Sequence, residues 1–146
     1  MRSVVVTGAS TGIGHATATL LVAAGFRVFG SVRSKADAER VTKEIGANFT
    51  PLLFDITDEQ AVKNAASQVR AALAGEALAG LVNNAGVSVP GPLLEVPIAD
   101  FRRQLEINVT GQVIVLQAFA PLLGADPALK GPPGRIVMIS DRKSVV

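Results

Sequence analysis

The sequence predicts an α/β protein built on a doubly wound parallel sheet. Short β-branched runs alternate with segments of helical periodicity over residues 1–140, which is typical of a parallel sheet with helices on both faces. The first run, residues 3–6, enters a glycine-rich turn at residues 7–14 that opens directly into a helical pattern. A strand, a glycine turn and a helix in this order form the first unit of nucleotide-binding βαβ folds.

Five strands and four helices follow from these patterns. The strands are expected at residues 3–6, 27–32, 50–54, 78–83 and 135–140. The helices are expected at residues 13–24, 35–45, 59–73 and 99–123. Gly25 ends the first helix and Asp58 caps the third. Right-handed crossovers then give the strand order 3-2-1-4-5, with a ligand crevice over the ends of the first and fourth strands, where the order reverses.

Composition narrows the class of protein. The 146 residues are 49% hydrophobic and 18% charged, which describes one globular domain rather than a disordered chain. There is no cysteine and one histidine, His15, so we expect no disulfide and no metal site. Basic residues are scattered and no apolar run approaches the roughly 20 residues of a membrane helix, so we expect neither a nucleic-acid surface nor a membrane partner. No signal-peptide pattern is present, which makes a cytoplasmic location the default.

The glycine turn has the spacing G-x-x-x-G-x-G. Gly8 lets the backbone turn off the strand, Gly12 lets it approach a pyrophosphate without a Cβ in the way, and Gly14 lets the helix pack close to the sheet. Free backbone N–H groups and the positive end of the helix converge at this turn, which favours a phosphate ligand. The alternative is a βα turn with a purely structural role.

Four separated segments carry a more specific pattern: residues 7–14, 55–57, 83–86 and 108–111. In order and spacing they resemble the short-chain dehydrogenase/reductase family, and the glycine spacing resembles its short, non-extended branch. The resemblance runs to Ser140 and implies a Rossmann-type NAD(P)-binding domain over residues 1–140. The implied reaction is hydride transfer between a nicotinamide cofactor and a small alcohol or carbonyl substrate.

The resemblance also implies roles for individual residues. The cofactor pyrophosphate and adenosine ribose would lie on the glycine turn, at Gly8, Ser10, Thr11, Gly12, Ile13 and Gly14. Asp55 would accept a hydrogen bond from the adenine amino group, and Ile56 would add a backbone contact. The ribose and nicotinamide side would be lined by Asn84, Ala85 and Gly86.

Two further asparagines lie at positions where asparagine is unusual. Asn83 ends a buried strand, where its amide is expected to tie strands together. Asn108 lies inside the helix at 99–123, and because asparagine is a poor helix-interior residue the sequence predicts a local kink or a bound water there. In the family this position belongs to the catalytic tetrad and helps to hold the water of a proton relay, so Asn108 is the candidate catalytic residue. The alternative is an exposed mid-helix asparagine.

The end of the second strand indicates which cofactor is preferred. In relatives that prefer NAD an acidic residue ends this strand and binds the ribose hydroxyls, whereas here Val32 occupies that place and Arg33 follows. A guanidinium matches a 2′-phosphate bidentately, so the sequence favours NADP(H), with NAD as the alternative. The other interpretation is that Arg33, like the nearby Lys35, is a solvated residue on the surface. His15 is expected on the surface rather than on a phosphate.

The chain contains no tyrosine, so it lacks the Tyr-x-x-x-Lys motif that supplies the acid/base group in the family. Asp141 holds the position of the usual catalytic serine, and Ser140 matches the serine before it. The resemblance therefore implies the cofactor-binding part of an NADP(H)-dependent oxidoreductase, truncated before its acid/base motif and inactive as written. The alternative function is a naturally short, non-catalytic NAD(P)-binding protein.

The last six residues, 141–146, do not continue the family pattern. The DNA of a widely used short-read sequencing adapter, read in one frame, encodes these same six residues followed by a stop codon. We therefore interpret them as an artefact and expect the natural gene to continue. Ending there leaves the fifth strand and one face of the long helix bare, and relatives use that face to oligomerise, so the full-length parent is expected to be a homo-oligomer. The apolar loop at residues 87–97 hints at a hydrophobic substrate.

Overall fold

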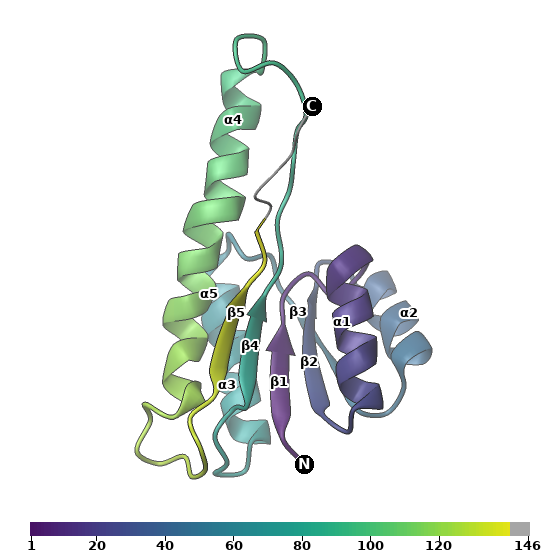
Figure 1. Cartoon of the computed structure of the whole chain (residues 1–146), viewed down its shortest axis with the longest axis vertical. Coiled ribbons are helices and arrows are strands. Elements are labelled where there is room, and N and C mark those ends of the chain that lie inside the picture. Colours follow the sequence, from purple (N-terminus) through teal and green to yellow (C-terminus); the bar gives the residue numbers. More distant parts are fainter. Residues whose placement is uncertain (141–146) are drawn as a thin grey trace.

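The computed structural model describes residues 1–140, which form a five-stranded parallel sheet flanked by helices (Figure 1). The strands are β1 (Ser3–Val6), β2 (Arg27–Val32), β3 (Phe49–Leu53), β4 (Gly80–Asn83) and β5 (Arg135–Met138). Their order across the sheet is β3-β2-β1-β4-β5, and every neighbouring pair is parallel. The predicted fold class and strand order are confirmed. The interpretation of residues 141–146 as a non-family tail lies outside the described residues, as does Asp141.

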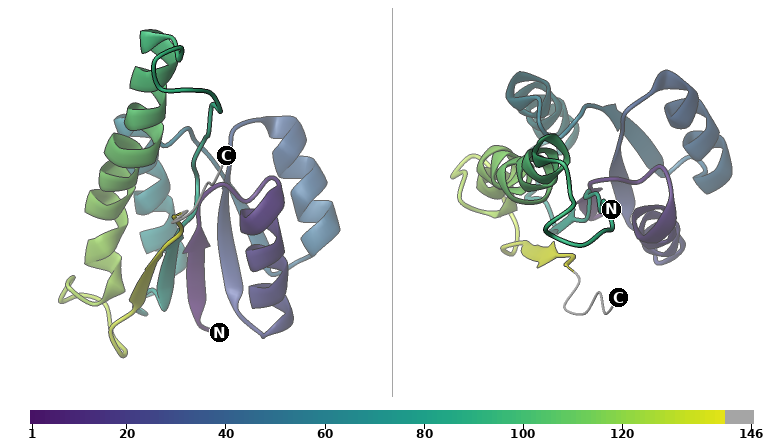
Figure 2. Two further views of the ribbon diagram at one scale, coloured as in Figure 1. Left: turned by 45° about the horizontal axis from the view of Figure 1, so that its top comes forward. Right: turned by 90° about the horizontal axis from the view of Figure 1, so that it is seen from above.

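Helices cover both faces of the sheet (Figure 2). The helices before β4 are α1 (Gly12–Ala23), α2 (Lys35–Ile45) and α3 (Glu59–Ala72). A longer helical run follows β4 and is divided into α4 (Ile98–Leu105), the π-helix η1 (Glu106–Gly111), α5 (Gln112–Phe119) and the 3₁₀-helix η2 (Ala120–Leu123). Helices α1 and α2 pack on one face, and α3 and α5 on the other.

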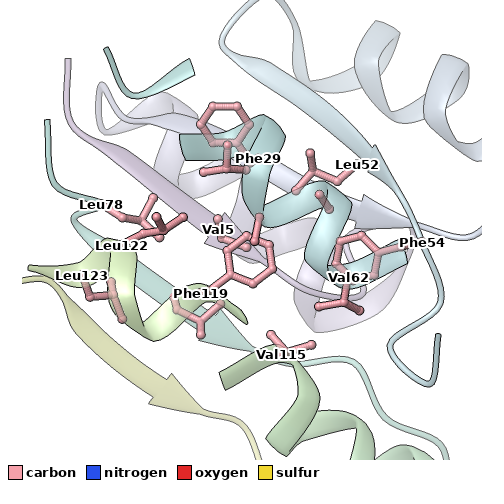
Figure 3. Close-up of a cluster of buried hydrophobic side chains, with 14 of the residues drawn as sticks. Val5, Phe29, Leu52, Phe54, Val62, Leu78, Val115, Phe119, Leu122 and Leu123 are labelled. Atoms are coloured by element: carbon pink, nitrogen blue, oxygen red, sulfur yellow. The ribbon is translucent and has the colours of Figure 1, made fainter. Parts of the chain in front are cut away.

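The core is divided between these two faces because successive strand residues point to opposite sides. On β1, Val5 points to the side of α3 and α5, whereas Val4 and Val6 point to the side of α1 and α2. The larger cluster contains Phe54 and Phe119, whose ring centroids are 6.5 Å apart (Figure 3). This packing holds the carboxyl ends of the first four strands in fixed positions relative to the helices.

The long helix is distorted around Asn108, as the sequence predicts. The segment Glu106–Gly111 is π-helical, with α-helix on either side. Single π-helical turns inside α-helices occur frequently at functional sites. The distortion takes the form of an expanded, π-helical turn, whereas the sequence predicted a local kink or a bound water.

The same helix corrects one expectation about membranes. By length and composition alone, Ile98–Leu123 could cross a bilayer, whereas we expected no segment to approach that length. The expectation was wrong because the charged residues, among them Arg102 and Glu106, gather in the first part of the helix. Val115 and Phe119 in the second half pack into the core, and 22% of the apolar window is buried.

The fifth strand is the least covered part of the sheet. Ile136, Val137 and Met138 are each 45–48% exposed, although they belong to a strand. A second apolar face is exposed along the long helix, at Phe101, Leu105, Val109 and Val113. The expectation that the fifth strand and one face of the long helix are bare is confirmed for the residues that the structure describes.

Candidate functional site

One pocket of about 280 Å³ opens at the carboxyl ends of β1, β2, β3 and β4, where the strand order reverses. Most of the predicted cofactor residues line it: Gly8, Ser10, Thr11, Ile13, Arg33, Asp55, Ile56, Asn84, Ala85 and Gly86. Among the described residues, the remaining candidates do not line the pocket: Gly12 and Asn108, which are exposed, and Gly14, which is buried. Sequence reasoning missed several lining residues: Ser31, Phe54, Val87 and Ile107.

Each of the three glycines of the turn is required for a different structural reason. Gly8 and Gly12 have positive φ angles of +67° and +58°, which a side chain disfavours. A Cβ on Gly12 would meet nothing within 4 Å, so the space over this residue is open. A Cβ on Gly14 would overlap the carbonyl oxygen of Gly8 and lie 2.5 Å from Asn84 Nδ2. Gly14 therefore permits close packing of α1 against the turn and the end of β4.

The amino terminus of α1 differs from those of its neighbours. Its N-cap residue, Thr11, makes no side-chain capping hydrogen bond, and its first turn holds no acidic residue. In contrast, Ser34 accepts from the backbone N–H of Asp37 to cap α2, and Asp58 caps α3 as predicted. The first N–H groups of α1 lie beside the pocket with no capping side chain, which suits an anionic ligand.

Thr7 joins β1 to the end of β4. Its buried hydroxyl oxygen accepts hydrogen bonds from the backbone N–H of Asn84 at 2.9 Å and of Ala85 at 3.0 Å. Asn84 Nδ2 donates in turn to the carbonyl of Thr7 at 3.0 Å. Asn83 is fully buried, and its Nδ2 donates to the carbonyl of Gln112 on α5 at 3.1 Å. Its Oδ1 accepts from the hydroxyl of Thr7, which follows β1, at 3.4 Å, so the predicted tie toward another strand runs through Thr7 and the shorter bond goes to a helix. The hydrogen bonds of Thr7 could not be predicted from the sequence, because its partners lie more than 70 residues away.

The end of β2 supports the turn and carries no acid. Ser31 accepts hydrogen bonds from two turn residues, through Oγ from Gly8 N–H and through its carbonyl from Ala9 N–H, both at 2.9 Å. Val32 is buried in the place where NAD-preferring relatives carry an acid. Arg33 follows it, is exposed and lines the pocket, so the charge at this end of the pocket is positive.

Asp55 is the acidic residue of the pocket lining. Its Oδ1 accepts from the backbone N–H of Thr57 at 2.9 Å and from the Thr57 hydroxyl at 2.8 Å. The hydrogen bond from the Thr57 backbone lowers the pKa of Asp55, and the positive charges of Arg33 and Arg103 act in the same direction. Asp55 is therefore ionised near neutral pH, and within residues 1–140 its Oδ2 has no hydrogen-bond partner.

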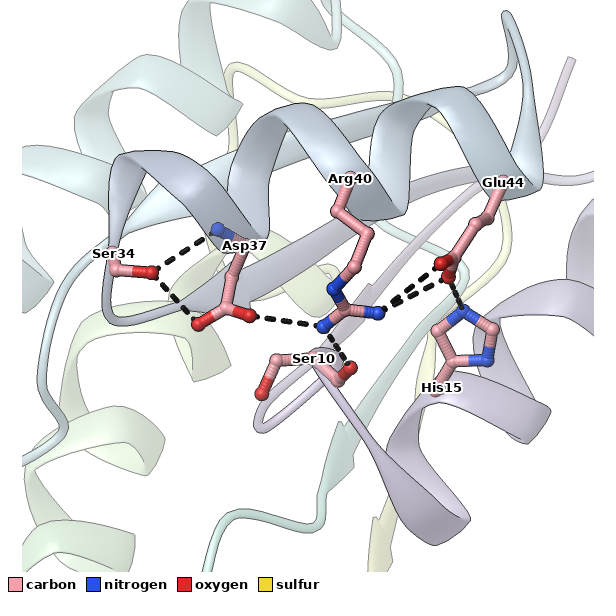
Figure 4. Close-up of polar contacts among 6 residues, drawn as sticks. All are labelled: Ser10, His15, Ser34, Asp37, Arg40 and Glu44. Atoms are coloured by element: carbon pink, nitrogen blue, oxygen red, sulfur yellow. Dashed lines mark hydrogen bonds and ion pairs between the residues drawn. The ribbon is translucent and has the colours of Figure 1, made fainter.

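A network of charged residues lies beside the glycine turn (Figure 4). Arg40 donates to the carbonyl of Ser10 at 2.8 Å and pairs with Asp37 and Glu44. His15 also contacts Glu44, at 2.9 Å, and does not line the pocket. The structure thus agrees with the expectation of a surface histidine, and it gives that histidine a partner on α2.

Asn108 holds the segment that follows β4. Its Nδ2 donates to the carbonyl of Val87 at 2.7 Å, and Val87 N–H donates to its Oδ1 at 2.8 Å. The side chain is exposed, as the alternative interpretation expects, but both ends of its amide are engaged. The structure thus gives Asn108 a structural role that the sequence did not suggest, and its catalytic role stays a prediction.

Comparisons with known proteins agree with this geometry. The sequence matches the family model for short chain dehydrogenases over residues 2–146. It is 41% identical to the NADPH-dependent 3-dehydrocapnine reductase of Ornithobacterium rhinotracheale, over 100% of this chain and 51% of that protein. It is 37% identical to the 3-amino-tetrahydro-pyrrolizinone reductase of Xenorhabdus hominickii, over 95% of this chain and 45% of that protein.

Solved structures with a similar fold are also found. The apo form of LigD from Sphingobium sp. strain SYK-6 matches with a TM-score of 0.85 at 28% identity, over 97% of this chain and 59% of that one. The chain spans about half the length of the curated relatives it matches. Proteins of this family are dehydrogenases and reductases that use nicotinamide cofactors. On sequence, fold and pocket together, the chain belongs to the short-chain dehydrogenase/reductase family.

Proposed function

We propose that this chain is the cofactor-binding part of an NADP(H)-dependent oxidoreductase acting on an alcohol or carbonyl substrate. The observation that carries the proposal is the end of β2, where Arg33 lines the pocket and Val32 replaces the acid of NAD-preferring relatives. The relative named as NADPH-dependent, at 41% identity, supports the same cofactor. The nicotinamide ring would supply or accept the hydride.

The residues of the pocket suit a dinucleotide. The open space over Gly12 and the uncapped start of α1 would accept the diphosphate, which backbone N–H groups bind well. Arg33 would bind the 2′-phosphate in a bidentate manner, and the ionised Asp55 would accept from the adenine amino group. The volume of about 280 Å³ is at the lower end of ligand pockets, so it would hold part of the dinucleotide.

The other side of the pocket would receive the nicotinamide. Asn84, Ala85 and Gly86 line it there, at the end of β4. Asn108 remains the candidate catalytic residue, but Val87 occupies its side-chain amide. In this arrangement the backbone of Asn108 is what remains to hold the water of a proton relay.

Nucleotide titration tests the proposal. Purified protein would be titrated with NADPH and NADH while the fluorescence of the reduced nicotinamide is followed. Arg33→Asp is expected to weaken NADPH binding by about tenfold or more, because a charge-assisted hydrogen-bond pair is lost, and to change NADH binding far less. Lys35→Asp is the matched control, since Lys35 lies outside the pocket lining. Folded wild-type protein that binds neither nucleotide would overturn the proposal, and equal effects on both would remove Arg33 from it.

A non-catalytic NAD(P)-binding protein is the second candidate, because the sequence has no tyrosine to serve as the family acid. Genomic sequence beyond Ser140 separates the two. A Tyr-x-x-x-Lys motif about a dozen residues past the serine position supports the enzyme, and a natural stop supports the binding protein. The hydrophobic substrate, the cytoplasmic location and the homo-oligomeric parent stay predictions.

A further inference from the structure

Three amide side chains of the long helix hold the segment that follows β4. The hydrogen bonds pair Gln104 with Val89, Asn108 with Val87, and Gln112 with Ala85. Val89 N–H donates to Gln104 Oε1 at 3.1 Å, and Gln112 Nε2 donates to the carbonyl of Ala85. We call Gln104, Asn108 and Gln112 the amide row. It runs antiparallel to the segment that it holds.

The distance between successive amides of the row matches the distance between the residues that they bind. The amide row uses every fourth residue of the helix, and four residues rise about 6 Å at 1.5 Å each. The held segment uses every second residue, and two residues of extended chain span about 6.6 Å. In an extended segment the backbone N–H and carbonyl groups of alternate residues point to the same edge, and Ala85, Val87 and Val89 each present such a group to the helix. Each amide therefore meets one residue of the segment in register, and Asn108 binds both the N–H and the carbonyl of Val87.

The π-helix explains why three amides four residues apart can share one line. In an α-helix four residues overshoot a turn of 3.6 residues by about 40°, so a third amide would be displaced by about 80°. A π-helical turn contains more residues, because its hydrogen bonds run from i to i+5, and this reduces the overshoot. The π segment Glu106–Gly111 lies between Gln104 and Gln112, where the correction is needed.

The segment held in this way forms one wall of the pocket. Ala85 and Val87 line the pocket, together with Gly86 between them. Within residues 1–140, the N–H groups of Val87 and Val89 have side-chain acceptors and no backbone acceptor. The conformation of this wall therefore depends on side chains of the long helix rather than on the sheet.

We propose that Gln104 and Gln112 are positioning residues that act with Asn108 to hold the nicotinamide side of the pocket in its binding conformation. The proposal rests on the proposed nicotinamide-nucleotide site. Gln112 is buried and also receives the side-chain amide of Asn83 on its carbonyl, so it joins the end of β4 to the same helix. Gln104 lies at the far end of the row and is half-buried, so its substitution disturbs the core less than substitution of the buried Gln112.

The test compares substitutions that keep or remove one hydrogen bond. Gln104→Glu keeps an acceptor for Val89 N–H, whereas Gln104→Met keeps the length of the side chain and removes the acceptor. Gln117→Met is the control, because Gln117 is exposed on the same helix and has no side-chain hydrogen bond among the described residues. Amide hydrogen exchange of Val87 and Val89 would be followed by NMR, and NADPH affinity by titration.

Gln104→Met is expected to speed exchange of the Val89 amide by roughly tenfold or more. It should weaken NADPH binding by about three- to tenfold, the size expected for one lost hydrogen bond. Gln104→Glu should leave the Val89 exchange rate and the NADPH affinity close to their wild-type values, and Gln117→Met should change neither quantity. Unchanged Val89 exchange in Gln104→Met, or faster exchange with unchanged NADPH affinity, would overturn the proposal. If folded wild-type protein binds no nucleotide, the proposed function is wrong. The exchange rates of Val87 and Val89 then still test whether the amide row holds the segment after β4.

Discussion

Arg40 and Ser10 are joined by a hydrogen bond of 2.8 Å from the guanidinium Nη2 to the backbone carbonyl oxygen (Figure 4). The guanidinium is itself held by Asp37 at 2.9 Å and by Glu44 at 3.2 Å. Because the peptide unit is planar and trans, fixing the Ser10 carbonyl also fixes the following Thr11 N–H in the opposite direction. Helix α2 thus helps to set the orientation of donors in the glycine turn.

This contact predicts that Arg40 affects both nucleotides equally. Arg40→Met should raise the dissociation constants of NADPH and NADH by a similar factor of about three to ten, the size expected for one hydrogen bond. The free energy of unfolding should change little, because exposed ion pairs contribute only about 0–1 kcal/mol. Fluorescence titration with both nucleotides and urea unfolding check this. A change in the ratio of the two constants, as expected for Arg33→Asp, would assign Arg40 to the 2′-phosphate instead.

Replacing Gly12 by alanine and replacing Gly14 by alanine are predicted to affect stability and nucleotide binding differently. Gly14→Ala forces a Cβ onto the carbonyl of Gly8, so it should lower the free energy of unfolding by about 3 kcal/mol or more. Gly12→Ala meets open space, and its positive φ should cost about 1 kcal/mol. Its main effect should be loss of nucleotide binding, because the new methyl group would enter the open space where the diphosphate is proposed to bind. Urea unfolding and NADPH titration separate the two effects, and equal losses of stability would contradict this account.

Much of the site could be predicted from the sequence because its residues sit in continuous motifs. The turn from Thr7 to Gly14 and the end of β4 follow strands that local pattern identifies, and the strand order then brings them together. Ser31 and the glutamines of the amide row could not be predicted in this way. Their partners lie far along the chain, with Ser31 and Gly8 separated by 23 residues, and no local pattern encodes such a contact.

The pKa of Asp55 predicts a pH dependence of stability. The carboxyl has a lower pKa in the folded state than its ordinary value, mainly because Thr57 N–H donates to it. Its ionised form therefore adds stability above the unfolded pKa of about 3.9, and this contribution is lost as the pH falls through the folded pKa. Urea unfolding should show Asp55→Asn less stable than wild type at pH 7, with the deficit shrinking as the pH falls below about 4 and disappearing once the pH is below the lowered folded pKa.

Asp55→Ala provides the contrast for this experiment. It removes the acceptor of both Thr57 hydrogen bonds whatever the pH, so its deficit should persist in acid. Asp37 and Asp126 also have lowered pKa values, and subtracting each variant from wild type cancels their contribution. A deficit of Asp55→Asn that is as large in acid as at pH 7 would show that ionisation of Asp55 is not the cause.

The exposed fifth strand predicts self-association of the 146-residue polypeptide. An apolar strand at the edge of a sheet offers unpaired backbone groups to another chain, and Val137 is 48% exposed there. Val137→Lys should shift the molecule toward monomer, because a charge on an edge strand opposes edge-to-edge pairing. Sedimentation velocity over a concentration series measures this. Leu20→Lys adds the same charge on α1, where Leu20 is 70% exposed, and should leave association unchanged. A wild-type protein that is monomeric throughout, or equal effects of the two lysines, would show that β5 does not drive association.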